Sequence, residues 1–126
     1  MNLNQITIPS LDVKTATEFY KKLGLILIVD ALPRYVRFEC PDGDSTFSIH
    51  KVEKLPTGEG LSIYFQNEDL DDLVSQLKQK EITFTHEPED KPWLWREAHL
   101  YDTDGNHIIL YSAGENRKNP PWRVTN

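Results

Sequence analysis

Three side chains in this sequence have the chemistry to move protons near neutral pH or to hold a metal ion. Glu97 and His99 are two residues apart in a segment with β-strand character, so both point to one face of a sheet. His50 falls on the same polar face by the alternation of its own segment. These candidate catalytic residues could form an acid–base set or a displaced zinc, nickel or iron site. The alternative is that Glu97 pairs with Arg37 or Arg96, and that the histidines only donate hydrogen bonds.

Aromatic residues of the same parity accompany these candidates. Trp93, Trp95, Tyr64 and Tyr111 alternate with apolar residues in the predicted strands. Rings gathered on one face are costly to leave in water, but they suit a pocket with a few polar anchors and attract bulky cations. We therefore expect a small-molecule ligand. The predicted ligand-binding residues are Gln5, Arg37, Ser48, Tyr64, Trp93, Trp95 and Tyr111.

The elements that must position these residues occur in the order strand, helix, strand, strand, strand. In the first half, Asp12 is a plausible N-cap for an amphipathic helix, and Gly24 follows its last turn. Apolar alternation and turn residues predict the strands around this helix, at 3–8, 25–30, 35–40 and 46–52.

The same order returns in the second half. Asn67 is the candidate N-cap of a helix with the apolar stripe Leu70, Leu73, Val74 and Leu77. The predicted strands lie at 61–65, 82–85, 94–101 and 107–111, and the hairpin turn 102–106 joins the last two. His86 is expected to lie in a loop without a role.

This order predicts an α+β fold of two tandem βαβββ modules, at about 1–55 and 58–112, whose curved mixed sheet forms a concave ligand cup. The tail 113–126 is expected to pack on this domain, with Trp122 as its contact. The helices should cover the apolar sheet face, which comprises Ile6, Ile8, Val36, Phe38, Cys40, Phe47, Ile49, Leu61, Ile63, Phe65, Leu94, Ala98, Leu100, Ile108 and Leu110.

Charge and composition limit the partners. The chain of 126 residues has a formal net charge of -6, which argues against nucleic acid and anionic membranes because phosphate binding needs a basic face. The single cysteine, Cys40, excludes an internal disulfide and is expected to be a buried strand residue. No segment is typical of a signal peptide or a membrane span, so we expect a cytoplasmic protein.

Two segments carry a family resemblance. Asp12-Val13-Lys14-Thr15-Ala16-Thr17-Glu18-Phe19-Tyr20-Lys21-Lys22-Leu23-Gly24-Leu25 and Asp102-Thr103-Asp104-Gly105-Asn106-His107-Ile108-Ile109-Leu110 resemble the vicinal oxygen chelate superfamily. That superfamily includes glyoxalase I, bleomycin-resistance proteins and extradiol dioxygenases. The resemblance covers about residues 3 to 112 and implies paired βαβββ modules, a homodimer and a ligand cup. The position that contacts substrate in fosfomycin-type members falls on His99 of this sequence, so the resemblance also implies substrate contact at His99.

The resemblance bears on a metal as well. The metal-ligand positions of the superfamily fall on Gln5, on Ser48 or His50, on Gly60 or Leu61, and on Ile109, where a glutamate is expected. Isoleucine cannot bind a metal ion, so we expect no standard metal site and no cofactor, and a divalent metal only at the displaced site.

Three functions follow as hypotheses. The first is a metal-free, glyoxalase/bleomycin-resistance-like protein that binds a small aromatic or polar compound. The alternative is a metal-dependent lyase, isomerase or dioxygenase of the same superfamily that uses the displaced His/Glu site, so whether the protein is an enzyme stays open. The third is an interaction module with a vestigial cup.

Overall fold

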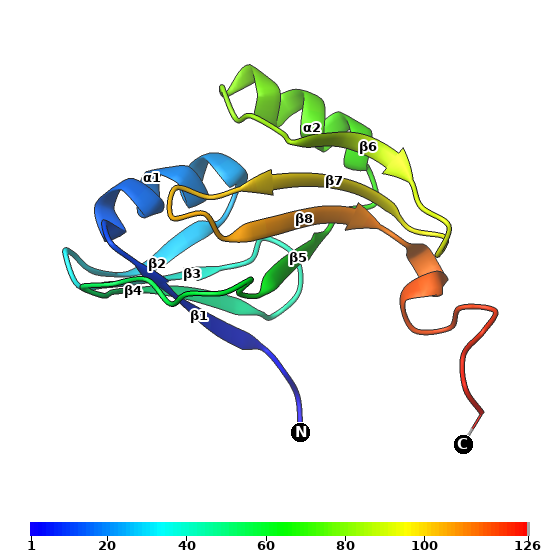
Figure 1. The fold of residues 1–126 in the computed structure, drawn as a ribbon, viewed down its shortest axis with the longest axis horizontal. Helices are drawn as coiled ribbons and strands as arrows, with labels where there is room; N and C mark the ends of the chain where they lie inside the picture. Colours follow the sequence, from blue (N-terminus) through cyan, green and yellow to red (C-terminus); the bar gives the residue numbers. More distant parts are fainter. Residues whose placement is uncertain (126) are drawn as a thin grey trace. The chain divides into compact units, whose positions relative to one another are not determined.

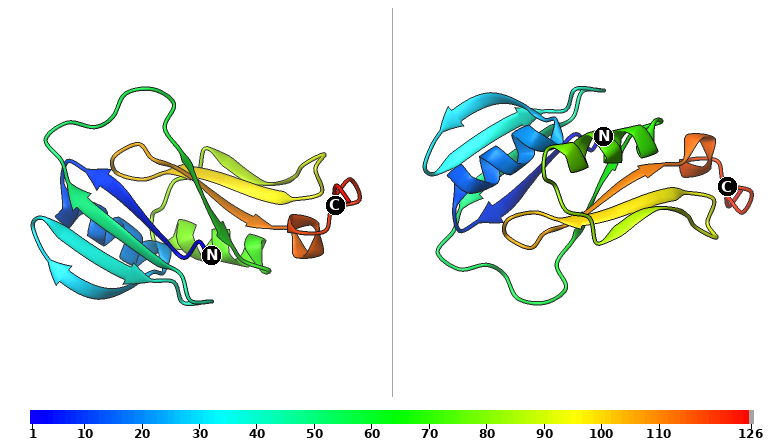
Figure 2. Two further views of the ribbon diagram at one scale, coloured as in Figure 1. Left: turned by 90° about the horizontal axis from the view of Figure 1, so that it is seen from below. Right: turned by 90° about the horizontal axis from the view of Figure 1, so that it is seen from above.

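The computed structural model describes residues 1–125, which form two compact units. The first unit contains residues 1–60 and the turn 102–105, and the second contains 61–101 and the described residues from 106 onward. Each unit is a four-stranded mixed sheet with one helix against one face (Figures 1 and 2). The predicted α+β fold of two tandem βαβββ modules is confirmed.

The first unit comprises β1 (Gln5–Ser10), α1 (Val13–Leu23), β2 (Ile26–Ala31), β3 (Tyr35–Glu39) and β4 (Thr46–Lys51). Its strand order is β1-β4-β3-β2, with β1 parallel to β4 and the other pairs antiparallel. The helix begins as predicted, because the Asp12 carboxylate accepts hydrogen bonds from the backbone N–H and the hydroxyl of Thr15, at 3.1 and 2.8 Å. Gly24 ends it at a φ of 114°, where glycine is favoured.

Tyr20 joins the core of the first unit to the turn 102–105. Its ring is fully buried against Phe38 and Phe47, and its hydroxyl donates to the buried carboxylate of Asp102. Burial, with the charge of Asp102, raises the pKa of Tyr20 far above its usual value. The backbone N–H of Leu11 donates to Asp104 Oδ1, so the hairpin turn of the second module is part of the first unit.

The second unit comprises β5 (Ser62–Gln66), α2 (Leu70–Gln79), β6 (His86–Asp90), β7 (Arg96–Tyr101), β8 (His107–Ser112) and the 3₁₀ helix η1 (Gly114–Arg117). Its strand order is β5-β8-β7-β6, with β5 parallel to β8 and the other pairs antiparallel. The helices of residues 1–125 are too short and too polar to cross a bilayer.

The end of α2 corrects the predicted strand at 82–85. Ile82 N–H donates to Leu77 O and Glu81 N–H to Lys78 O, with Glu81 at a φ of 67°. These bonds form a Schellman C-cap, so Ile82 is buried as its apolar anchor and not as a strand residue. The strand follows as β6, and His86, which was expected in a loop, is its first residue.

The beginning of α2 also differs from the prediction. The N-cap is Asp69, whereas the side chain of Asn67 accepts a hydrogen bond from the Asp69 N–H at 2.8 Å. Asn67 therefore makes a local turn in front of the helix.

Three of the residues predicted on the apolar helix face are not buried strand residues. Leu94 has a φ of 67° and is 48% exposed, because Lys91 and Trp95 close a three-residue turn that delays the start of β7. Leu61 precedes β5 and is exposed, and Cys40 lies just after β3, only partly buried. Trp122 is 57% exposed, so it is not the apolar anchor that was predicted for the tail.

Candidate functional site

The open face of the second sheet collects most of the predicted site residues. In the strand register Tyr64 is opposite Ile109, His99 is opposite Ile109, and Glu97 is opposite Tyr111, so these side chains share one face. The alternate residues Ile63, Ala98, Leu100, Ile108 and Leu110 are buried on the face that α2 covers. The predicted division of this sheet into an apolar helix face and a polar, aromatic open face therefore agrees with the register.

Three rings on this open face form what we call the aromatic platform: Tyr64, Trp95 and Tyr111. Trp95 and Tyr111 stack with centroids 4.5 Å apart, and Tyr64 meets both edge-on at 5.9 and 5.8 Å. The Trp95 indole N–H donates to the carbonyl of Asn116 in η1, at 3.3 Å. Tyr111 is buried, and burial raises its pKa, whereas Tyr64 is 50% exposed. Trp95 and Tyr111 thus form a fixed stacked pair, and Tyr64, which packs against both rings edge-on, remains accessible.

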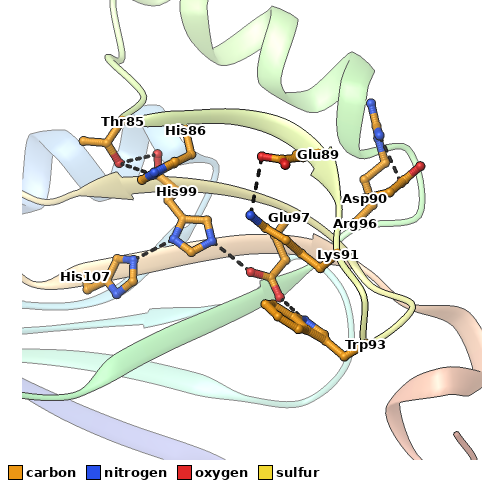
Figure 3. A network of polar contacts seen from close by, with 10 residues as sticks. All are labelled: Thr85, His86, Glu89, Asp90, Lys91, Trp93, Arg96, Glu97, His99 and His107. Carbon is orange, nitrogen blue, oxygen red and sulfur yellow. Dashed lines mark hydrogen bonds and ion pairs between the residues drawn. The ribbon is translucent and has the colours of Figure 1, made fainter.

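A continuous run of hydrogen bonds, here called the polar chain, crosses the same face: Trp93, Glu97, His99, His107 and Ser62. Trp93 Nε1 is 2.7 Å from Glu97 Oε2, and His99 Nε2 is 2.8 Å from Glu97 Oε1. His99 Nδ1 is 2.9 Å from His107 Nε2, and the Ser62 hydroxyl is 3.1 Å from His107 Nδ1. Figure 3 shows the first four members pointing toward one another in this order.

The donors and acceptors of the polar chain follow from its chemistry. An ionised Glu97 can only accept, so the indole N–H of Trp93 and the Nε2–H of His99 both donate to it. With His99 neutral, its Nδ1 accepts from His107 Nε2–H, and His107 Nδ1 accepts from the Ser62 hydroxyl. If the Nε2 proton of His107 moves to His99 Nδ1, the Ser62 proton moves to His107 Nδ1 and a solvent proton replaces it on Ser62, the two bonds reverse without moving a ring. The arrangement can therefore pass a proton between neighbouring groups.

The charge state of His107 is set by its surroundings. Burial lowers the pKa of His107, and the positive charges that His99 and His86 carry when protonated lower it further. Glu97 opposes this to a smaller extent. His107 is therefore held neutral at pH 7, in the form that can accept a proton.

Sequence reasoning missed two histidines of this site. His107 was not among the predicted site residues, and its diagonal position beside His99 depends on the β7–β8 register. His86 is opposite His99 on β6, with ring centroids 5.2 Å apart. A parity argument could have placed His86 on this face only if β6 had been located correctly.

The proposed pairing of Glu97 with an arginine is wrong. Both oxygens of Glu97 are taken by Trp93 and His99, and Glu97 is only 4% exposed. Arg96 points to the helix face, where it binds Asp71 through two nitrogens at 2.9 and 3.0 Å and also pairs with Asp90. Neighbouring residues of a strand face opposite sides of the sheet. Arg96 and Glu97 are neighbours on β7, so Arg96 cannot pair with Glu97.

The remaining predicted site residues belong to the first unit. Gln5 accepts a hydrogen bond from Thr46 at 2.8 Å, and Ser48 is bonded to Tyr35 at 2.7 Å. Arg37 donates to the Tyr35 hydroxyl at 2.9 Å. His50 is exposed near the end of β4, opposite Tyr35 in the register.

The structure shows the surroundings of two of the metal positions that the superfamily resemblance implies, Gln5 and Ile109. Ile109 has no ligating atom and is buried beside Tyr111, and the amide oxygen of Gln5 already accepts from Thr46. Among residues 1–125, no three His, Cys, Asp or Glu side chains gather in a way that could hold a metal ion.

Comparisons with known proteins place these observations in a family context. The family model described as Glyoxalase-like domain matches residues 3–113. A comparison with curated proteins finds no match. A glyoxalase/bleomycin resistance protein/dioxygenase from Nocardioides has a similar structure, with a TM-score of 0.79 and 19% identity over 99% of this chain and 90% of that chain.

Two further solved structures are informative. A member of the glyoxalase/bleomycin resistance protein/dioxygenase superfamily from Sphaerobacter thermophilus DSM 20745 has a TM-score of 0.70 and 26% identity, over 89% of this chain and 97% of that chain. A bleomycin-binding protein complexed with bleomycin has a TM-score of 0.73 and 22% identity, over 89% and 98%.

Proposed function

The chain belongs to the Glyoxalase-like domain family, and we propose that it binds a small aromatic or planar polar molecule on the open face of its second unit. The observation that carries this proposal is the aromatic platform beside the polar chain. Together they offer ring faces for stacking and hydrogen-bonding groups for orientation, the combination typical of small-molecule sites. A bleomycin-binding protein with the same fold supports a binding role.

The exposed rings provide the driving force for binding. Tyr64 is 50% exposed and Trp93 is 46% exposed, on a face where Trp95 and Tyr111 already pack together. Covering such a half-exposed ring with a planar ligand contributes about 1–2 kcal/mol for each ring. Trp93 is held by its hydrogen bond to Glu97, so little side-chain freedom is lost when the ligand arrives.

The polar chain would select among ligands that fit the platform. Because both oxygens of Glu97 and both nitrogens of His99 and of His107 are already bonded, the polar group left to a ligand is the hydroxyl of Ser62. While its proton points to His107, the Ser62 oxygen keeps lone pairs that can accept from a ligand, so a ligand with one donor edge would be oriented by it. The acidic chain, at a net charge of -6, favours a cationic ligand over an anionic one at this face.

The proposal includes no divalent metal, since Ile109 and the bonded Gln5 occupy positions at which the superfamily binds one. Several parts of it are carried over from the sequence alone: a homodimer, a cytoplasmic location and no nucleic-acid partner. The tail 113–126 packing on the domain is likewise a proposal, supported by the Trp95–Asn116 hydrogen bond.

The test is a thermal-shift screen with aromatic antibiotics, thiol conjugates and catechols, because a ligand that binds only the folded state raises its melting temperature. The shift of each hit should disappear in Trp95→Ala. It should persist in Trp122→Ala, which removes an exposed tryptophan outside the platform. Hits that survive Trp95→Ala, or a screen without hits, would refute the proposed site.

A second candidate function is acid–base catalysis by the polar chain. The observation that favours it is the unbroken run of bonds from Glu97 through His99 and His107 to Ser62. Conversion of a bound hit, lost in His99→Asn and unchanged in His50→Asn, would establish catalysis at this chain. If metal analysis instead finds a stoichiometric ion that either variant removes, the displaced metal site is correct.

A further inference from the structure

The open face of the first sheet carries an arginine that is held in place but has no acid to neutralise it. Arg37 on β3 is partly buried, and its Nε donates to the Tyr35 hydroxyl at 2.9 Å. Its guanidinium also lies over the Tyr35 ring, 5.6 Å from the centroid. Both contacts use one edge of the guanidinium and its stem, and they restrict its rotation.

Tyr35 is in turn fixed by a buried residue. The Tyr35 hydroxyl is 2.7 Å from the hydroxyl of Ser48 on β4, and Ser48 is fully buried. The Tyr35 oxygen accepts from Arg37, and either hydroxyl of the Tyr35–Ser48 pair can be the donor of their bond. The hydrogen bonds from Ser48, and then from Arg37, lower the pKa of Tyr35. Ser48 thus positions Tyr35, and Tyr35 positions Arg37.

The two terminal nitrogens of the Arg37 guanidinium have no hydrogen-bond acceptor among the described residues. Nη1 and Nη2 of Arg37 have four N–H donors, and in residues 1–125 none of them meets a carboxylate or another acceptor. Arg96 differs from Arg37, since Arg96 binds both Asp71 and Asp90.

We propose that Arg37 is the anchor of an anion site that takes a carboxylate or a phosphate through two parallel N–H bonds. A guanidinium with its outer fork free and its inner edge fixed is preorganised for such bidentate contact. His50, which is exposed and opposite Tyr35 in the register, is a candidate for a second donor. This site lies in the other unit and goes beyond the ligand proposed for the aromatic platform.

The test is an NMR titration of ¹⁵N-labelled full-length protein with sodium acetate and, separately, with sodium phosphate, at an ionic strength held constant with chloride. Acetate has no ring, so it does not report on the aromatic platform. The Arg37 Nε–H signal should shift to saturation, with a dissociation constant of roughly 1–10 mM for at least one anion. The tighter anion identifies the class of ligand.

Matched variants distinguish anion binding at Arg37 from nonspecific attraction of anions to positive charge. Arg37→Gln should weaken binding at least tenfold, and Arg37→Lys should retain part of it, because lysine keeps the charge without the fork. Tyr35→Phe should weaken binding while leaving the charge unchanged. Arg34→Gln, which removes an exposed arginine of the same unit, should have no effect.

Shifts that rise linearly without saturation, or an equal loss in Arg34→Gln and Arg37→Gln, would overturn the site. If Arg37→Gln does not fold, Arg37→Lys and Tyr35→Phe decide the question. Trp95→Ala should leave acetate or phosphate binding unchanged, so this proposal and the aromatic platform can fail independently.

Discussion

His99 and His107 meet across β7 and β8, with Nδ1 of one ring 2.9 Å from Nε2 of the other. The pair is diagonal in the register, since His99 is opposite Ile109 and His107 is opposite Tyr101. Two neutral imidazoles can make this bond only if one donates and the other accepts. The carboxylate of Glu97 decides which, because it requires the proton of His99 on Nε2.

Glu97 should be a larger source of stability than the acidic residues around it. Glu97→Ala removes the buried acceptor of the Trp93 and His99 donors, so the free energy of unfolding should fall by about 1–3 kcal/mol. Urea denaturation measures this. Glu89→Ala is the matched control on the neighbouring strand β6, where the side chain is exposed, and it should stay within about 0.5 kcal/mol of the wild type. Equal effects would contradict the role of Glu97.

The stability of the protein should fall in mildly acidic solution, in part through His107. The pKa of His107 in the folded protein lies below its unfolded value of about 6.5, so the unfolded chain binds more protons as the pH falls. His107 does not affect the free energy of unfolding at a pH above its unfolded pKa. As the pH falls from the unfolded pKa through the folded pKa, the free energy of unfolding decreases. Urea unfolding at pH 7.5, 6.5 and 5.5 should show a shallower loss in His107→Gln. An unchanged slope would show that His107 does not contribute.

The hydrogen bond from Tyr20 to Asp102 should stabilise the core of the first unit. Tyr20→Phe keeps the ring but removes one donor from a buried carboxylate, which should cost about 1–3 kcal/mol. Tyr101→Phe removes the hydroxyl of a half-exposed tyrosine and should change little. Thermal unfolding compares the two variants. A Tyr20→Phe protein as stable as Tyr101→Phe would show that the bond contributes nothing.

Glu81 should be a position where glycine improves the protein. Its φ of 67° is in the left-handed region, which costs a residue with a side chain about 1 kcal/mol. Glu81→Gly should therefore raise the free energy of unfolding by up to about 1 kcal/mol. Gly24→Ala, at the equivalent end of α1, should lower it. A loss of stability in Glu81→Gly would mean that the Schellman cap needs the glutamate side chain.

The C-terminal ends of α1 and α2 show which parts of the fold could be predicted from the sequence. Gly24 marks the end of α1, and with Asp12 it allowed the first helix to be placed correctly. The same C-cap occurs at Glu81 without a glycine, so the sequence contained no signal for it, and the following strand was placed four residues too early. His86 was missed as a consequence.

In the candidate site, too, some residues could be placed from the sequence and others could not. Alternation along β7 and β8 was enough to put Glu97, His99 and Tyr111 on one face. The stagger between strands, which brings His99 to His107 and not to another residue, depends on the register and on the turn before β7. Leu94 adopts an unexpected left-handed conformation in that turn, so the position of Trp93 beside Glu97 could not be derived from parity.

The most direct test of the central claim uses the three tryptophans of the chain. Trp93 and Trp95 belong to the polar chain and the aromatic platform, and Trp122 lies exposed in the tail. In a ¹H–¹⁵N spectrum with a planar ligand from the screen, the indole signals of Trp93 and Trp95 should shift to saturation while that of Trp122 stays in place. A saturating ligand that moves only Trp122, or none of the three, would contradict binding at the open face of the second unit.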